Sequence, residues 1–406
     1  MQELEKKYIE LILNRCLNFE QSKSLMIHCD LKEHITFAEK VKKEAYKIGV
    51  NDVCIHVNDL DEVHAYLKRT PVSEIKNNPI IDRTDWNDYA KKGAALLFLN
   101  SGVPGLMDDI PNEKLKRWNE IREESLKYYR KNLGSYVFPW CIVAMPNERW
   151  AKTVFQDDKN AYEKLYLNIM KMCMVDKDNP IKEWEEYISK NNYYKKRLNE
   201  LKIKSLHYTN SLGTSLTVGL PEEIEWLNLD KKDVKGGQMI ANMPSYEIFT
   251  TPDFRKTNGI VYSSKPLIYN DCFIDKFCIE FKDGKAISCK AELGQDKLEE
   301  LLFNTPGADC LGEVALVPHD SPISNTGLIF NTTLFDENAS CHLAVGRGFK
   351  KSFINSDMLS DEQLIERGYN FSNTHVDFMI GTSDLQIEAD TKEGKKLIFK
   401  NGNFNI

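Results

Sequence analysis

Apolar and polar residues follow two alternating periods in the first half of the chain. Short apolar runs, typical of buried strands, alternate with longer segments in which apolar residues recur every three or four positions, as in helices. The predicted strands are residues 24–28, 52–56, 94–99 and 136–144, and the predicted helices are residues 2–18, 33–48, 112–131, 158–175 and 180–200. This alternation predicts an open α/β domain with a mostly parallel sheet and helices on both faces.

From about residue 205 the pattern changes to short strands and turns. Apolar alternation marks residues 212–218, 259–262 and 278–281, and the pair Asp283-Gly284 separates the last of these from another apolar alternation at 286–292. Asp-Gly between two such runs is a strong hairpin signal. The second half therefore predicts a β-rich α+β domain, and we expect two domains, 1–204 and 205–406, because 406 residues exceed what one core usually serves.

Composition and charge narrow the classes of partner. The formal net charge is −7 and acids and bases are interspersed, which argues against a nucleic-acid groove or an anionic membrane surface and favours a small or peptide-like substrate. No apolar run approaches the ~20 residues of a membrane span, and no GxGxxG or GxxxxGK[ST] follows a predicted strand. The start lacks the features of a signal peptide, and the ten cysteines form no CxxC pair, so we expect a cytoplasmic protein with reduced thiols.

One strand-like segment near the C-terminus carries a possible metal-binding pair. His375 and Asp377 are two residues apart in an apolar run, so their side chains lie on the same face of a strand and could bind one ion. The alternative is a histidine and an acid that only keep an edge strand soluble. These two residues alone leave both interpretations open.

His342, Glu247 and Glu313 could join this pair as metal ligands. Residues 334–346 predict a short helix that contains His342, with Asp336 as its N-cap and Gly346 as its end. Asp336 and its neighbour Glu337 could be ligands, but acids at a helix start are more often caps, and we favour that interpretation. Glu247 and Glu313 lie in apolar surroundings, where a carboxylate usually pairs or binds metal; the alternative is an acid that reaches solvent at a strand end.

Together the five candidate ligands supply three carboxylates and two imidazoles. Such a mixed oxygen and nitrogen set suits zinc, cobalt or manganese, and five ligands are too many for one tetrahedral site. Two metals with a bridging carboxylate could hold a water between them and polarise a scissile carbonyl. Peptide hydrolysis fits that equipment. The candidates are Glu247, Glu313, His342, His375 and Asp377.

At these residues the chain resembles the thermophilic metalloaminopeptidases, the family of aminopeptidase T, aminopeptidase S and aminopeptidase II. The resemblance covers GTSLTVGL at 213–220, NMPSYEIFTTPD at 242–253, GEVALVP at 312–318, residues 321–346, and HVDFMIG at 375–381. It implies the same five metal ligands, with Glu313 as the bridge between two ions. It also implies removal of N-terminal residues from unblocked peptides, activation by cobalt, zinc or magnesium, and homodimers whose active sites face a restricted internal cavity.

The sequence departs from the family pattern at two positions. Seven residues after His342 the family has a catalytic tyrosine, and this chain has Phe349. The residue before Glu247 is Tyr246 where the family usually has an acid, which affects the expected preference near the free amine of the substrate. If the missing hydroxyl normally stabilises an oxyanion, its loss costs on the order of 10²- to 10³-fold in rate.

Three hypotheses follow. The first is an active aminopeptidase in which Glu313 or another nearby carboxylate handles the proton of the attacking water. In that case Arg347 or Tyr369 replaces the missing hydroxyl, or the hydroxyl is only supportive. The second is a metal-binding pseudo-peptidase or peptide-binding protein that lost efficient turnover through Phe349. The third is a metallohydrolase that acts on another amide.

Overall fold

The computed structural model describes residues 1–17, 19, 23–78, 80, 84–156, 158–233, 235–270 and 272–406. The chain forms two compact units, and each unit is built from two segments. The first unit contains residues 1–186 and 229–244, and the second contains residues 187–228 and 245–406. The units thus interleave along the sequence, and the division into 1–204 and 205–406 stays a prediction.

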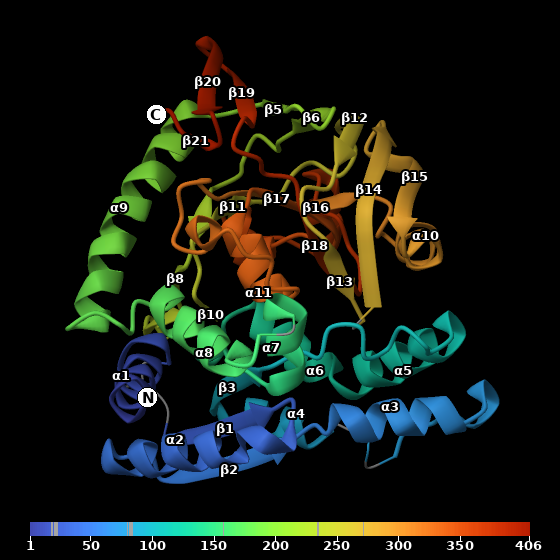
Figure 1. The fold of residues 1–406 in the computed structure, drawn as a ribbon. Coiled ribbons are helices and arrows are strands. Elements are labelled where there is room, and N and C mark those ends of the chain that lie inside the picture. Colours follow the sequence, from blue (N-terminus) through green and yellow to red (C-terminus); the bar gives the residue numbers. More distant parts are fainter. Residues whose placement is uncertain are drawn as a thin grey trace. The chain divides into compact units, whose positions relative to one another are not determined.

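The first unit is built on a parallel five-stranded sheet, as the pattern predicted (Figure 1). The strands lie in the order β10-β4-β3-β1-β2, and four of them come from the predicted apolar runs. Strand β1 shows the reason: SLMIHC is buried at five of its six positions, as in a strand covered on both faces. The strands are β1 (Ser24–Cys29), β2 (Asp52–Val57), β3 (Ala95–Asn100), β4 (Trp140–Ala144) and β10 (Asn242–Met243), beside a separate pair, β8 (Asp230–Lys232) and β9 (Gln238–Ile240).

Helices follow each of the first four strands. Helix α2 buries Phe37, Ala38, Val41 and Ala45, the spacing of one helical face, and packs against β1 and β2. The helices are α1 (Gln2–Leu11), α2 (Ile35–Lys47), α3 (Leu60–Arg69), α4 (Thr84–Lys92), α5 (Asn112–Ser125), α6 (Lys127–Gly134), α7 (Glu148–Phe155) and α8 (Ala161–Met172). The pattern missed α3, α4 and α7 and joined α5 to α6. The predicted helix 2–18 continues from α1 into a π-helical turn at Ile12–Cys16, and residue 18 lies outside the described residues.

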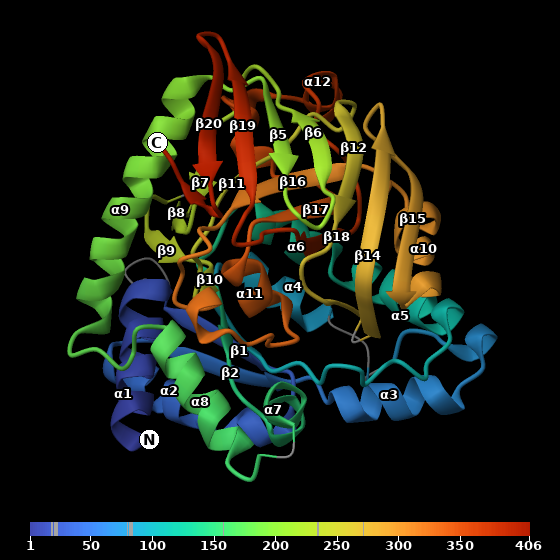
Figure 2. The same cartoon turned by 45° about the horizontal axis from the view of Figure 1, so that its top comes forward.

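The second unit contains two antiparallel sheets, which confirms the predicted change to a β-rich region (Figure 2). The smaller sheet has the order β18-β17-β16-β11-β7: β7 (Leu227–Asn228), β11 (Ile248–Thr250), β16 (Leu311–Leu316), β17 (His342–Gly346) and β18 (His375–Met379). The larger sheet contains β5 (Ser205–Thr209), β6 (Ser215–Gly219), β12 (Thr257–Tyr262), β13 (Leu267–Tyr269), β14 (Cys272–Lys282), β15 (Lys285–Leu293), β19 (Gln386–Thr391), β20 (Gly394–Lys400) and β21 (Asn403–Phe404). The helices are α9 (Pro180–Leu201, of which residues from 187 belong to this unit), α10 (Gln295–Asn304), α11 (Thr333–Asp336) and α12 (Asp361–Glu366).

The predicted hairpin is formed by β14 and β15. Asp283 and Gly284 both have positive φ, 49° and 88°, as the tight turn between such strands requires. A Cβ at Gly284 would also lie 2.0 Å from the carbonyl oxygen of Phe254. Only glycine therefore fits at this turn.

One hydrophobic core lies between the two sheets of the second unit. It contains side chains from the larger sheet, such as Leu216 and Ile279, and from the smaller sheet, such as Val314, Leu343 and Phe378. One face of the smaller sheet therefore packs into this core. The alternate side chains of its strands lie on the opposite face.

The predicted helix at 334–346 is wrong. Helix α11 starts after Thr332 and continues into a short 3₁₀ turn at Glu337–Ala339, and His342 opens strand β17. Asp336 is no N-cap: its carboxylate accepts hydrogen bonds from the backbone N–H groups of Phe330 and Thr332. Pairing of β17 with β16 and β18 on both sides overrides the local helical pattern.

Candidate metal centre

Four adjacent strands bring the five predicted ligands to one face of the smaller sheet. Glu247 directly precedes β11, Glu313 lies in β16, His342 in β17, and His375 and Asp377 in β18. Their neighbours in sequence point into the core, so strand alternation forces these polar side chains onto the opposite face.

Small residues leave room between the polar side chains. In the sheet register Ala315 lies opposite His342, and Ala344 lies opposite Asp377. Both alanines share the face of the five candidates, where a methyl group fills little space. The two alanines therefore add little bulk between the larger side chains.

A β-bulge at Gly312 changes the direction of the side chains at the start of β16. The register with β17 shifts between Leu311 and Glu313, which places Leu311 in the core while Glu313 faces away from it. A Cβ at Gly312 would lie 2.4 Å from the carbonyl oxygens of Gly346 and Arg347. The bulge therefore depends on glycine at this position.

The candidates form two groups of three that share Glu313. One ligand atom from each of Glu247, Glu313 and His342 lies within 4.8 Å of the others, and the same holds for Glu313, His375 and Asp377. Within these groups, His342 Nε2 lies 3.2 Å from Glu247 Oε2, and His375 Nε2 lies 3.0 Å from Glu313 Oε2. Each group supplies the oxygen and nitrogen ligands that a zinc-like ion prefers.

Backbone carbonyls orient both imidazoles. His342 Nδ1 donates to the carbonyl oxygen of Glu337 at 2.9 Å, and His375 Nδ1 donates to that of Arg347 at 2.6 Å. These bonds direct each Nε2 toward the carboxylates. Metal-binding histidines are usually held in this way.

The site concentrates negative charge that is poorly solvated. Burial raises the pKa of the Glu313 carboxyl to about 7, and the hydrogen bond from His375 opposes this only in part. Burial alone would lower the pKa of His375, yet the charge of Asp377 and its hydrogen bond raise that pKa well above the ordinary value. Asp377 Oδ1 is buried, and His375 Nε2 lies 3.3 Å from it. A divalent cation would offset this buried negative charge, so the residues fit such an ion.

Glu337 is a further acid of this site that sequence reasoning assigned to a helix start. It is 7% exposed, and burial together with the charges of Asp377 and Glu247 raises the pKa of its carboxyl well above the ordinary range. The sequence contained one indication of this role, the pair of adjacent acids at 336 and 337. Only one of two adjacent acids is needed to accept hydrogen bonds from the local backbone, so the other is available for a site. Only the structure shows that Asp336 binds the backbone and that Glu337 lies near the other acids of the site.

The two departures from the family pattern occupy different surroundings. The ring of Phe349 contacts His375 edge-on, with 4.9 Å between centroids, and also packs on Phe249. Tyr246 is buried and its ring packs against that of Tyr187. Phe349 thus lies directly beside the metal-binding candidates.

Arg347 and Tyr369 are the two residues that could replace the missing hydroxyl. Arg347 reaches the centre through its backbone carbonyl, which orients His375. The ring of Tyr369 packs edge-on against Phe353 and Phe371.

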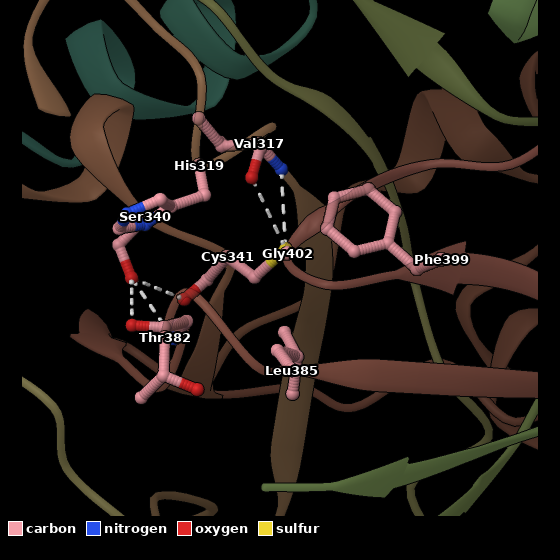
Figure 3. A pocket seen from close by; sticks show the side chains of 9 residues that line it. Val317, His319, Ser340, Cys341, Thr382, Leu385, Phe399 and Gly402 are labelled. Carbon is pink, nitrogen blue, oxygen red and sulfur yellow. Dashed lines mark hydrogen bonds between the residues drawn. The ribbon is translucent and has the colours of Figure 1, made fainter. Parts of the chain in front are cut away.

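A small pocket near the start of β17 contains His319 and Cys341 (Figure 3). The thiol of Cys341 donates to the carbonyl oxygen of Val317 at 3.3 Å and accepts from its N–H at 3.4 Å. These contacts fix the residue that precedes His342. We assign the pocket a structural role.

In the described part of the chain, no helix combines the length and apolar character that a membrane crossing requires. All ten cysteines are free thiols.

Comparison with known proteins places the chain among peptidases. Residues 1–404 match the thermophilic metalloprotease (M29) family. The chain is 36% identical over 403 residues to aminopeptidase 2 of Geobacillus stearothermophilus, covering 98% of this chain and 97% of that protein. It is 33% identical over 402 residues to aminopeptidase AmpS of Bacillus subtilis (strain 168), covering 98% and 97%. The solved structure of wild-type AmpT from Thermus thermophilus matches with a TM-score of 0.89 at 28% identity, covering 100% of this chain and 99% of that one.

The fold and the acidic, histidine-containing site therefore define a metallopeptidase, an enzyme. The chain belongs to the thermophilic metalloprotease (M29) family, which confirms the resemblance found in the sequence. The α/β fold class is confirmed as well.

Proposed function

We propose that this protein is an aminopeptidase that removes N-terminal residues from unblocked peptides with the help of two divalent metal ions. The observation that supports the count of two is the division of the five ligands into two groups that share Glu313. The curated relatives named above are aminopeptidases, which supports the substrate class. Zinc, cobalt, manganese and magnesium are the candidate ions.

The bound ions would supply a water of lowered pKa and would polarise the scissile carbonyl. The chain's own residues hold this arrangement in place. Glu313 belongs to both groups and would be the ligand shared by the two ions. The carbonyls of Glu337 and Arg347 keep the imidazoles of His342 and His375 in position. Little reorganisation is then needed during the reaction.

A carboxylate of the centre takes the proton of the attacking water and passes it to the leaving amine. Glu313 and Glu337 are both buried, and they are the carboxylates we propose for this role. Glu337 lies outside both three-residue groups, so it can carry a proton without releasing a ligand of either group.

Substrate reaches the centre from the side of β18. The side chains of His375 and Asp377 are 18% and 15% exposed, whereas those of Glu247, Glu313 and His342 are 11%, 4% and 1% exposed. A peptide would therefore approach next to His375, where Phe349 also lies.

A second candidate function rests on Phe349. Its ring lies against His375 at the position of the family's tyrosine and provides no hydroxyl. A metal-binding pseudo-peptidase or peptide-binding protein would retain the ligands and turn over slowly. We propose the active enzyme as the function, because every other part of the centre is in place.

Two further properties belong to this proposal. We propose a homodimer, as the family resemblance implies, and a cytoplasmic location, in agreement with ten free thiols. Light scattering of the purified protein tests the first, and cell fractionation tests the second.

The deciding experiment is hydrolysis of unblocked and N-acetylated peptides by the purified protein, with and without zinc or cobalt and after chelation. The proposal expects metal-dependent release of N-terminal residues from unblocked peptides only. Bound metal without turnover would reject the active enzyme and support the second candidate. Turnover that survives complete chelation would reject the role of the metals.

A further inference from the structure

We propose that Asn338 is a positioning residue that holds two sides of the metal centre in register, an inference that rests on the proposed function. One end of its carboxamide holds the segment that carries Glu247. The other end holds the carboxylate of Glu337.

The first contact fixes the backbone next to Glu247. Asn338 Oδ1 accepts a hydrogen bond from the N–H of Tyr246 at 2.7 Å. Strand β11 begins only at Ile248, so the ladder of the sheet does not fix Tyr246. The side chain of Asn338 takes the place of a strand partner at this point.

A second side chain holds the same residue from the other end. The hydroxyl of Tyr187 in α9 donates to the carbonyl oxygen of Tyr246 at 3.0 Å. Both polar backbone groups of Tyr246 are therefore bound by side chains. Glu247 follows directly, and its Oε2 lies 3.2 Å from His342 Nε2.

The amide nitrogen of Asn338 serves the other side of the centre. Nδ2 donates to Glu337 Oε1 at 3.2 Å and to the carbonyl oxygen of Leu334 at 2.9 Å. The carbonyl oxygen of the same Glu337 accepts from His342 Nδ1. Asn338 thus stiffens the turn that orients His342 and at the same time holds a carboxylate of the centre.

No other side chain of this size can make this set of bonds. Asn338 is 0% exposed and needs one acceptor and two donors in fixed directions. Aspartate retains the acceptor and lacks both donors, and alanine lacks all three. The two substitutions therefore separate the two ends of the carboxamide.

The experiment compares Asn338→Ala, Asn338→Asp and Asn147→Ala with the wild-type full-length protein. Asn147 is a matched control: it is 1% exposed, its Oδ1 accepts from the N–H of Trp150, and its Nδ2 donates to Ser101. It belongs to the first unit, outside the metal centre. The readouts are zinc affinity by competition with a chromophoric chelator, kcat at saturating zinc, and thermal unfolding without metal.

We expect Asn338→Ala to lower zinc affinity about 10- to 100-fold, the usual effect of removing a group that orients metal ligands. Asn338→Asp should keep zinc affinity within about threefold, because Tyr246 keeps its acceptor, and lower kcat about 10- to 100-fold, because Glu337 loses its donor. Asn147→Ala should lower the unfolding temperature and leave zinc affinity and kcat unchanged. If Asn338 had a purely structural role, its substitutions would lower zinc affinity and kcat only in proportion to the loss of stability.

Wild-type zinc affinity in a folded Asn338→Ala would overturn the inference. If that variant fails to fold, Asn338→Asp decides, and a wild-type kcat at saturating zinc would overturn it. A wild-type protein that binds zinc and cleaves no peptide would instead reject the proposed function, and zinc affinity alone would then test Asn338.

Discussion

The ring of Phe349 stands edge-on to the imidazole of His375, with 4.9 Å between centroids and 66° between planes. Phe349 therefore lies directly beside one of the proposed metal ligands. Its backbone is also fixed, because the N–H of Phe349 donates to Thr251 Oγ1 at 2.8 Å. The absence of a hydroxyl on this ring is a local feature beside the proposed ligands.

Phe349→Tyr measures what that hydroxyl contributes. For an active enzyme we expect kcat to rise less than tenfold, because such an enzyme already turns over without this hydroxyl. A lost oxyanion donor would instead appear as a gain on the order of 10²- to 10³-fold. Steady-state hydrolysis of an unblocked dipeptide amide distinguishes the two. Phe249→Tyr is the matched control, because Phe249 packs against the same ring.

Glu313→Gln and Glu247→Gln test the shared ligand. Glu313 belongs to both three-residue groups and Glu247 to one. We expect Glu313→Gln to lose both bound ions and all measurable turnover, and Glu247→Gln to retain one ion. Metal analysis after dialysis gives the two stoichiometries. Equal stoichiometry in both variants would contradict a bridging role for Glu313.

Gly312→Ala tests the bulge. The added methyl group would overlap the carbonyl oxygens of Gly346 and Arg347, and the latter orients His375. We expect a loss of about 1–3 kcal/mol in the free energy of unfolding, typical of overpacking, together with weaker metal binding. Gly134→Ala is the control, since no atom lies within 4 Å of its added Cβ. Urea titration and zinc affinity, measured on both variants, check the prediction.

The carboxyl of Asp253 should make the stability of the folded protein depend on pH. Burial raises the pKa of its carboxyl, but hydrogen bonds from Arg255 and Lys256 outweigh this and lower the pKa below its ordinary value of 3.8. A group with a lowered folded-state pKa stabilises the protein above its unfolded-state pKa and loses this effect as pH falls through the folded-state value.

Asp253→Asn should therefore cost about 1.5–3 kcal/mol at pH 7, the usual worth of hydrogen bonds to a charged group. The difference from wild type should shrink as pH falls below about 4. Chemical denaturation at pH 7, 5 and 3.5 measures it. A difference that stays constant over this range would show that the charge of Asp253 does not matter.

The sequence by itself determined the α/β first unit and the β-rich character of the second. Buried parallel strands such as β1 need an unbroken apolar run, and the Asp283-Gly284 turn needs residues that tolerate positive φ, so both are visible locally. Local patterns also proposed the five candidate ligands, because His375 and Asp377 alternate with apolar neighbours and the two glutamates lie in apolar segments.

Tertiary structure alone decided how these residues meet. His342 lies in a segment with a helical pattern and becomes a strand residue because β16 and β18 pair with it on both sides. Glu337 joins the centre and Asp336 serves the backbone, although the two acids are adjacent in sequence. Local propensity amounts to fractions of a kcal/mol per residue, whereas strand pairing and core burial between two sheets sum over many residues and therefore decide the outcome.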